Sequence, residues 1–182
     1  MPSDPMHAGR RALLRGAAAL GLSALDGLLS PRVSAAELRV GARAPPATLV
    51  TLDGARIVTT DLLGTVVILT FWATWCGPCR QELPLLSSFA KQYAARGLSI
   101  LGFSIDGPEE LPKVRKMAQA FEFPVGLLPE ARLPGYGRIW HIPVSFTIDR
   151  QGLLRDNGWD DKDATWTAEQ LDRIVIPLVN SQ

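Results

Sequence analysis

Trp75-Cys76-Gly77-Pro78-Cys79 contains the only two cysteines of the 182-residue chain. Residues 65–72, just before it, are apolar and rich in β-branched side chains, which predicts a buried strand. Residues 80–95, just after it, carry apolar side chains at helical spacing. The cysteine pair is therefore expected where a strand ends and a helix begins.

This junction gives the two cysteines a defined chemistry. The first turn of a helix has unpaired N–H groups and the positive end of the helix dipole, and both lower the pKa of a thiol placed there. Two cysteines one helical turn apart can also close a disulfide. We interpret Cys76 as the attacking thiolate, because it is nearer the helix end, and Cys79 as the thiol that resolves the mixed disulfide.

A structural disulfide and half of a zinc site are the alternatives for this pair. Zinc needs three or four ligands, and the chain offers only two cysteines and two histidines, His7 and His141. His7 lies in an N-terminal extension described below. The zinc alternative is weak, so we predict neither a metal site nor a cofactor.

Residues 71–84, Phe-Trp-Ala-Thr-Trp-Cys-Gly-Pro-Cys-Arg-Gln-Glu-Leu-Pro, resemble the active-site segment of the TlpA/ResA-like thioredoxin-fold proteins. Members of that family are extracytoplasmic thiol–disulfide oxidoreductases of bacteria. The resemblance implies an α/β thioredoxin fold, with a central mixed β-sheet flanked by helices. It also implies an N-terminal β-hairpin and a strand–helix insertion of the TlpA type, at about residues 121–133.

Composition narrows the class of protein. Hydrophobic side chains make up 47% of the chain, charged side chains 20%, and the formal net charge is +1. Because there is no basic stripe, nothing indicates nucleic acid as a partner. The length allows one domain with a full core and a short extension.

Residues 1–36 have the order of a secretory leader: basic, then apolar, then small side chains. Arg10 and Arg11 are adjacent and precede an Ala/Leu/Gly-rich stretch, which resembles a twin-arginine export signal. We expect cleavage near Ala36, a thioredoxin-like domain at residues 37–182 and a periplasmic location. A retained membrane anchor is the alternative, and Asp26 inside the apolar stretch argues against it.

The remaining pattern predicts strands that alternate with helices, and thus a parallel sheet core with helices on both faces. Pro177 is expected to kink the closing helix or to end it early. The expected elements are a hairpin at residues 48–52 and 56–59, strands at 98–105, 124–128 and 153–159, and helices at 109–121 and 167–180.

Residues 136–149 resemble the segment that carries the cis-proline of thioredoxin-fold proteins, with Pro143 in that place. The X–Pro bond is the one peptide bond that adopts cis at low cost. The resemblance implies that this turn faces the disulfide and that the backbone of Ile142 pairs with a substrate strand. An ordinary trans proline at a strand start is the alternative.

Glu82 lies three positions after Cys79 and so on the same side of the helix. TlpA/ResA-like proteins carry an acidic residue here that takes part in proton transfer, and a carboxylate near two thiols opposes a second negative charge. The alternative is a solvated residue bonded to Arg80. Thr70 stands where thioredoxins have a buried Asp, so Glu82 is the one carboxylate that we expect near the thiols.

The expected substrate surface consists of Trp75, Gly77 and Pro78 together with Ile142 and Pro143. We predict a disulfide reductase, because Gly-Pro between the cysteines resembles the reducing members of the family. Such members act in cytochrome c maturation or in copper-site assembly of oxidases, and the sequence does not choose between these roles. We expect protein disulfides as substrates, a membrane electron donor, a monomer and no membrane span in residues 37–182.

Two other functions compete with this one. A copper chaperone would use Cys76, Cys79 and His141, since soft thiolates suit Cu(I). A thiol peroxidase would need a Thr three residues before its single reactive cysteine, but Ala73 occupies that position. The peroxidase alternative therefore ranks last.

Overall fold

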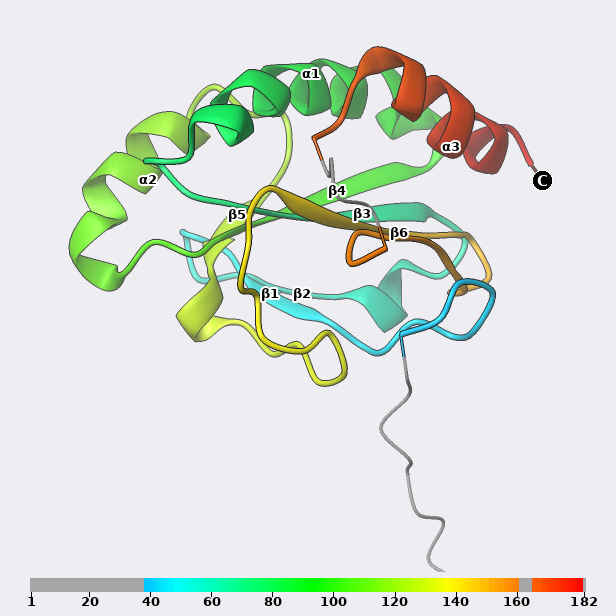
Figure 1. Cartoon of the computed structure of the whole chain (residues 1–182), viewed down its shortest axis with the longest axis horizontal. Coiled ribbons are helices and arrows are strands. Elements are labelled where there is room, and N and C mark those ends of the chain that lie inside the picture. Colours follow the sequence, from blue (N-terminus) through cyan, green and yellow to red (C-terminus); the bar gives the residue numbers. More distant parts are fainter. Residues whose placement is uncertain (1–37, 161–164, 182) are drawn as a thin grey trace, which may run out of the picture. The chain divides into compact units, whose positions relative to one another are not determined.

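The computed structural model describes residues 38–160 and 165–181. The expected leader, residues 1–36, lies outside them. Within the described part, five strands form one sheet in the order β5-β4-β3-β6-β7 (Figure 1). β3 pairs in parallel with β4 and antiparallel with β6, so the expected mixed sheet is confirmed. The strands are β3 (Val66–Trp72), β4 (Leu98–Ser104), β5 (Val125–Leu127), β6 (Val144–Ile148) and β7 (Leu154–Asn157).

The expected N-terminal hairpin is also present. β1 (Thr48–Val50) and β2 (Arg56–Val58) pair antiparallel in a sheet of their own. The insertion expected at about residues 121–133 contains β5 and a 3-10 helix, Leu128–Glu130. β5 pairs in parallel with β4 and thereby widens the sheet by one strand.

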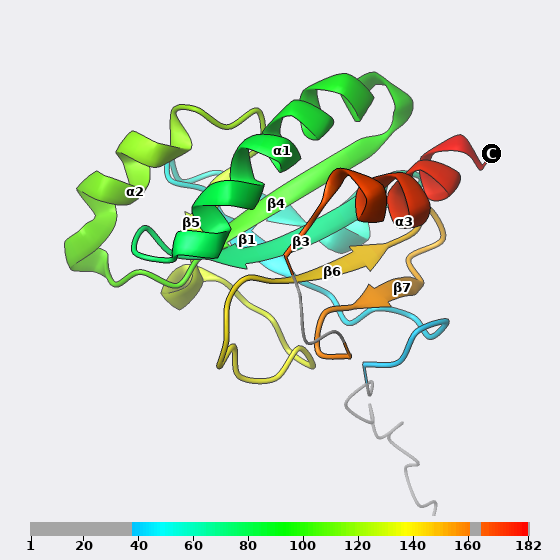
Figure 2. The ribbon, with the colours of Figure 1, turned by 45° about the horizontal axis from the view of Figure 1, so that its top comes forward.

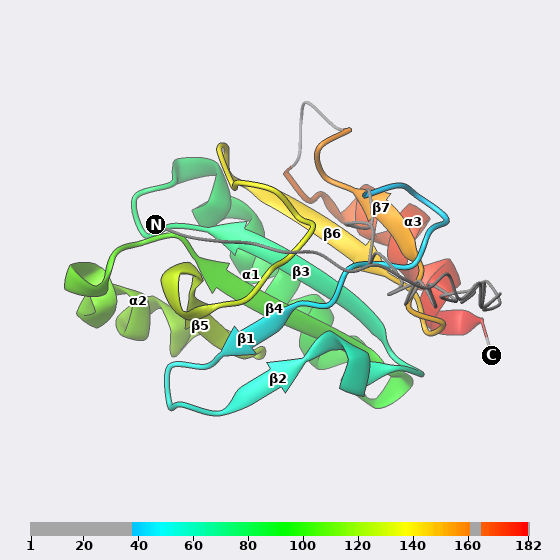
Figure 3. The same cartoon turned by 90° about the horizontal axis from the view of Figure 1, so that it is seen from below.

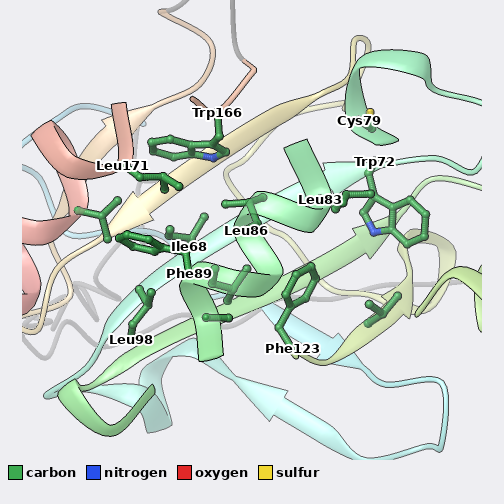
Figure 4. Packing of buried hydrophobic residues seen from close by; sticks show 14 of the residues in the cluster. Ile68, Trp72, Cys79, Leu83, Leu86, Phe89, Leu98, Phe123, Trp166 and Leu171 are labelled. Atoms are coloured by element: carbon green, nitrogen blue, oxygen red, sulfur yellow. The ribbon is translucent and has the colours of Figure 1, made fainter. Parts of the chain in front are cut away.

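All three described α-helices pack on one face of the sheet (Figures 1 and 2). The helices are α1 (Gly77–Tyr93), α2 (Leu111–Ala118) and α3 (Ala168–Asn180). They share a buried apolar cluster with alternate residues of β3, among them Ile68 and Trp72. Figure 4 shows this cluster from close by, with Cys79 and Trp72 toward one end and Leu98 toward the other.

The expectation of helices on both faces is therefore wrong for the described residues. The second face is covered by the hairpin and by the chain between β5 and β6, which contribute Leu49 and Tyr136 to a separate buried cluster. That connection contains Pro129, Pro134 and two glycines with positive φ, Gly135 and Gly137. Proline and such glycines interrupt a helix, so the connection forms no α-helix there.

The expectation that Pro177 ends α3 early is also wrong. α3 runs on to Asn180, and the N–H of Ser181 donates to the Pro177 carbonyl at 3.0 Å. A proline this close to the C-terminus removes one helical hydrogen bond. Val175 and Val179, buried on either side of it, hold the last turn against the sheet.

One N-terminal segment contacts both ends of the sheet (Figure 3). At one end, the N–H of Gly41 donates to the carbonyl of Leu154 in β7 at 2.7 Å, and the N–H of Leu154 donates to the carbonyl of Ala42 at 2.9 Å. At the other end, the N–H of Leu52, just after β1, donates to the carbonyl of Val125 in β5 at 2.9 Å. Residues 41–52 therefore hydrogen-bond to both edge strands.

Candidate redox site

The two cysteines form a disulfide at the start of α1. The S–S distance is 2.02 Å and the Cα atoms are 5.3 Å apart. Cys76 is the N-cap residue of the helix, and its sulfur accepts a hydrogen bond from the N–H of Cys79 at 3.2 Å. Cys76 retains 5% of its surface and Cys79 none, so Cys76 is the more exposed of the two cysteines.

The cis-proline predicted from the sequence is present: the peptide bond between Ile142 and Pro143 is cis. Pro143 directly precedes β6, whose first residue, Val144, pairs with Phe71 near the end of β3. The cysteine pair follows the end of that same strand. The sheet register thus brings the cis bond and the disulfide to one end of the sheet, and Ile142 packs against the apolar cluster that contains both cysteines.

Glu82 is buried, so the alternative of a solvated helix residue paired with Arg80 is wrong. Only 1% of its surface is exposed. Its Oε2 accepts the backbone N–H of Trp166 at 2.7 Å, whereas Arg80 donates to the carbonyl of Thr74 at 3.2 Å. Burial raises the pKa of Glu82 to about 7, and the Trp166 N–H partly offsets that rise. A carboxyl with this pKa can take up or release a proton near neutral pH.

A second buried carboxylate, Asp106, holds the loop that leads to Cys76. It accepts the Thr74 N–H at 2.8 Å, the Thr74 hydroxyl at 2.7 Å and the Ser104 hydroxyl at 2.6 Å. Together with the bond from Arg80, every polar atom of Thr74 has a partner. The loop two residues before the disulfide is therefore fixed from both sides.

Sequence reasoning did not find this role of Asp106. A signal for the role does exist: Asp106 closely follows β4, and β4 is the parallel neighbour of the strand that leads to the cysteines. The carboxyl ends of neighbouring parallel strands meet at one edge of a sheet.

The expected substrate surface is open beside Cys76. Trp75 is 65% exposed, Pro78 is exposed and Gly77 is half-buried. Trp75 lines a groove of about 610 Å³ together with Ile105 and Met117, and charged side chains of the α2 region stand around it. Trp72, by contrast, is fully buried.

A second exposed tryptophan lies near the cis bond. Trp140 is 73% exposed and stacks on Trp159, with ring centroids 5.7 Å apart. His141 contacts both rings edge-on, at 4.1 and 5.1 Å between centroids. In the part of the chain that the structure describes, no three His, Cys, Asp or Glu side chains form a group that could hold a metal ion. Cys76, Cys79 and His141 thus do not make the copper site considered above.

Comparison with known proteins agrees with this geometry. The AhpC/TSA family model matches residues 40–157. The chain belongs to the AhpC/TSA family. A thiol-disulfide oxidoreductase ResA of Bacillus cereus is 30% identical over 118 residues, which cover 65% of this chain and 68% of the relative.

Two further relatives extend the comparison. The thioredoxin-like protein YneN of Bacillus subtilis (strain 168) is 32% identical over 122 residues, covering 65% of this chain and 71% of that protein. A crystal structure of a thiol:disulfide interchange protein of the thioredoxin family from Chlorobium tepidum TLS superposes with a TM-score of 0.64 at 30% identity. That match covers 80% of this chain and 100% of the other. This member of the family is accordingly a thiol–disulfide oxidoreductase with a thioredoxin fold.

Proposed function

We propose that the protein is an extracytoplasmic reductase of protein disulfides. One observation carries the proposal: the Cys76–Cys79 disulfide lies at the first turn of α1, where the helix end favours a thiolate. The cis bond before Pro143 and the buried carboxyl of Glu82 support it.

In the proposed reaction, the thiolate of reduced Cys76 attacks one sulfur of a substrate disulfide and releases the other as a thiolate. Glu82 takes the proton of the Cys79 thiol, and the Cys79 sulfur then attacks Cys76. The substrate leaves with both of its cysteines reduced, and the Cys76–Cys79 disulfide forms. Two electrons have moved to the substrate, and an external dithiol must return two electrons before the next cycle.

We assign substrate contacts to the exposed residues around Cys76 and to the backbone beside the cis bond. Trp75, Gly77 and Pro78 flank Cys76 in the sequence and are exposed or half-buried. The backbone of Ile142, next to Pro143 at the cis bond, is assigned to pair with an extended substrate segment. Apocytochrome c and the copper-site cysteines of an oxidase are the two substrate classes that fit the proposal.

Reduction of insulin by dithiothreitol tests the assignment of the cysteines. Wild type should accelerate insulin precipitation, and both Cys76→Ser and Cys79→Ser should lose that acceleration. Cys79→Ser should in addition retain substrate proteins as mixed disulfides on Cys76, because it lacks the resolving thiol. Undiminished insulin reduction by either variant would refute the assignment.

The assignment of the protein as a reductase rests on Gly77-Pro78 between the cysteines. A separate experiment tests this direction of electron transfer. Equilibration of the pair with glutathione buffers gives its reduction potential. A reductase requires a potential well below the value of about −120 mV found for the strong oxidant DsbA. A potential near that value would contradict the proposed reductase activity and would indicate that the protein oxidises its substrates.

We also propose export to the periplasm, with a membrane protein as electron donor and the monomer as the working form. The leader-like order of residues 1–36 supports the export. Among the described residues, no helix has the length and apolar character needed to cross a membrane.

A further inference from the structure

Large apolar side chains are exposed at both ends of the sheet. The exposed ones among the described residues are Val40, Leu63, Trp75 and Trp140. Leu63 lies just before the start of β3, and Val40 lies beside the segment that bonds to the start of β7, so both are at the end away from the cysteines. The two tryptophans lie at the end where the disulfide and the cis bond meet. Tryptophan is one of the residues that most often dominate a binding surface.

Trp140 is the more exposed of the two tryptophans, with 73% of its surface open. Successive Cα atoms are about 3.8 Å apart, so the Cα atom of Trp140 lies within about 8 Å of that of Ile142. Ile142 packs against the cluster that contains both cysteines, and its backbone is the part that we assign to the substrate. Trp140 therefore borders the surface on which a substrate segment would lie.

Neighbouring side chains hold the Trp140 ring in position. It stacks on Trp159, with ring centroids 5.7 Å apart and an angle of 11° between the planes. Trp159 is anchored in turn, because its Nε1–H donates to the Tyr136 carbonyl at 3.0 Å and its ring packs edge-on against buried Phe146. A side chain that is already ordered loses little conformational entropy when a partner binds to it.

One side of the Trp140 ring is left open. The centroid of the His141 ring lies 4.1 Å from that of Trp140 and 5.1 Å from that of Trp159. With the 5.7 Å between the two indoles, these distances form a compact triangle. His141 and Trp159 therefore lie on the same side of Trp140, and the opposite side carries the exposed surface.

The open side favours a flat side chain over a charged one. The nearest charged residues in the sequence are Arg138, before Trp140, and Asp160, after Trp159, and both are exposed. Their charges are opposite, so neither sign dominates beside the pair. The open side offers the π face of an indole, on which a second aromatic ring gains more than its contact area alone would give.

We propose that Trp140 is a substrate-binding residue that stacks on an aromatic side chain of the substrate protein, a few residues from the cysteine that Cys76 attacks. This inference rests on the proposed function and deepens it, because it names a feature of the substrate. An extended segment advances about 3.3 Å per residue. The distance between Trp140 and Ile142 therefore corresponds to two or three residues of a substrate strand that pairs with Ile142.

Peptides activated as pyridyl disulfides test this assignment. Each peptide has one cysteine, in a mixed disulfide with 2-thiopyridine, and carries Phe, Leu, Lys or Ala at a position two, three or four residues before or after that cysteine. The thiolate of reduced Cys76 attacks the peptide sulfur, because pyridinethione is the better leaving group, and stopped-flow absorbance follows its release. For at least one position, wild type should react with the Phe peptide roughly fivefold faster than with the Ala peptide. Leu and Lys should give smaller gains.

Substitution of Trp140 identifies the residue responsible for this preference. Trp140→Ala should react equally fast with the Phe and Ala peptides, because the stacking surface is gone. Trp140→Phe keeps a planar ring and should keep most of the preference, whereas Trp140→Leu keeps apolar area without a π face and should lose it. All three variants should react with the Ala peptides at the wild-type rate, since that rate reports the Cys76 thiolate without the stacking contact.

Leu63→Ala is the matched control. Leu63 is also large and 57% exposed, but it lies at the end of the sheet away from the cysteines, so the variant should keep the full preference for Phe. Equal wild-type rates with the Phe and Ala peptides at every position overturn the inference. A preference that Trp140→Ala retains, or a gain with Leu or Lys that matches the gain with Phe, overturns it as well. Reduction of insulin by wild type tests the proposed function independently.

Discussion

At the scale of single residues, the two buried carboxyls at the site, Asp106 and Glu82, have different roles. Asp106 accepts three hydrogen bonds and fixes the loop before Cys76. Glu82 accepts one and keeps its second oxygen without a partner in the described residues. Asp106 therefore positions the loop, whereas burial with a single hydrogen bond raises the pKa of Glu82.

Replacement of Glu82 by Gln should change how stability depends on pH. The pKa of Glu82 is raised from 4.5 to about 7 in the folded chain, so between these pH values the folded state holds a proton that the unfolded state has released. The free energy of unfolding of wild type therefore falls as pH rises from about 4.5 to about 7, by about 3 kcal/mol. Glu82→Gln should lack this decline, and above pH 7 it should be the more stable protein.

Urea unfolding of both proteins in the oxidised form, at pH 5 and pH 8, measures this difference. The disulfide keeps thiol titration out of the comparison. A wild-type curve that stays parallel to that of Glu82→Gln over this range would show that Glu82 titrates normally in the folded chain.

At the scale of elements, the close approach of β5 to the hairpin is the tightest constraint. A Cβ built on Gly126 would overlap the carbonyl oxygen of Val50 at the end of β1. Gly126→Ala should therefore push the hairpin away from β5 and lower the free energy of unfolding by about 3 kcal/mol. Chemical denaturation measures this loss.

Gly77→Ala serves as the control for that substitution. A Cβ at Gly77 meets nothing within 4 Å, and alanine is a better helix former than glycine in the first turn of α1. Its unfolding free energy should equal or exceed that of wild type. Equal stability of Gly126→Ala and wild type would mean that the hairpin can shift away at no cost.

The elements also show what the sequence could predict. β3, β4 and β5 are predictable within a few residues, because each is a short apolar run bounded by turn residues. β7, Leu-Arg-Asp-Asn, is not apolar, and its position follows from the hairpin turn at Arg150-Gln151-Gly152. The sequence does not predict which segments cover the second face of the sheet. The chain between β5 and β6 lacks a helical pattern, and Leu49, which shares its buried cluster, is far away in the sequence. For the site, the disulfide and the cis bond followed from a local motif.

The partners of the two carboxyls could not be predicted in the same way. Glu82 bonds to Trp166 over a separation of 84 residues, and Asp106 bonds to Thr74 over 32. Such contacts depend on how the helices and strands pack, which local spacing does not encode. The helical periodicity of residues 80–95 placed Glu82 on the cysteine side of α1 but gave no measure of its burial.

At the scale of the whole molecule, the proposed export decides where the disulfide chemistry takes place. Substitution of both Arg10 and Arg11 by Lys should keep the precursor in the cytoplasm, because twin-arginine export recognises the arginine pair. Osmotic-shock fractionation with mass measurement follows the protein, and the periplasmic form of wild type should begin at or near Glu37. Arg15→Lys should be exported normally. Unimpaired export of the double variant would point to another route.

We expect the segment of residues 41–52, which bonds to β7 at one edge of the sheet and to β5 at the other, to protect the protein from self-association. Exposed edge strands are templates on which further molecules add strand by strand into aggregates. Here one segment, residues 41–52, covers both edge strands. A protease cut near Asp53 that released this segment would therefore expose β5 and β7 at the same time. Loss of solubility should then precede any loss of thiol chemistry.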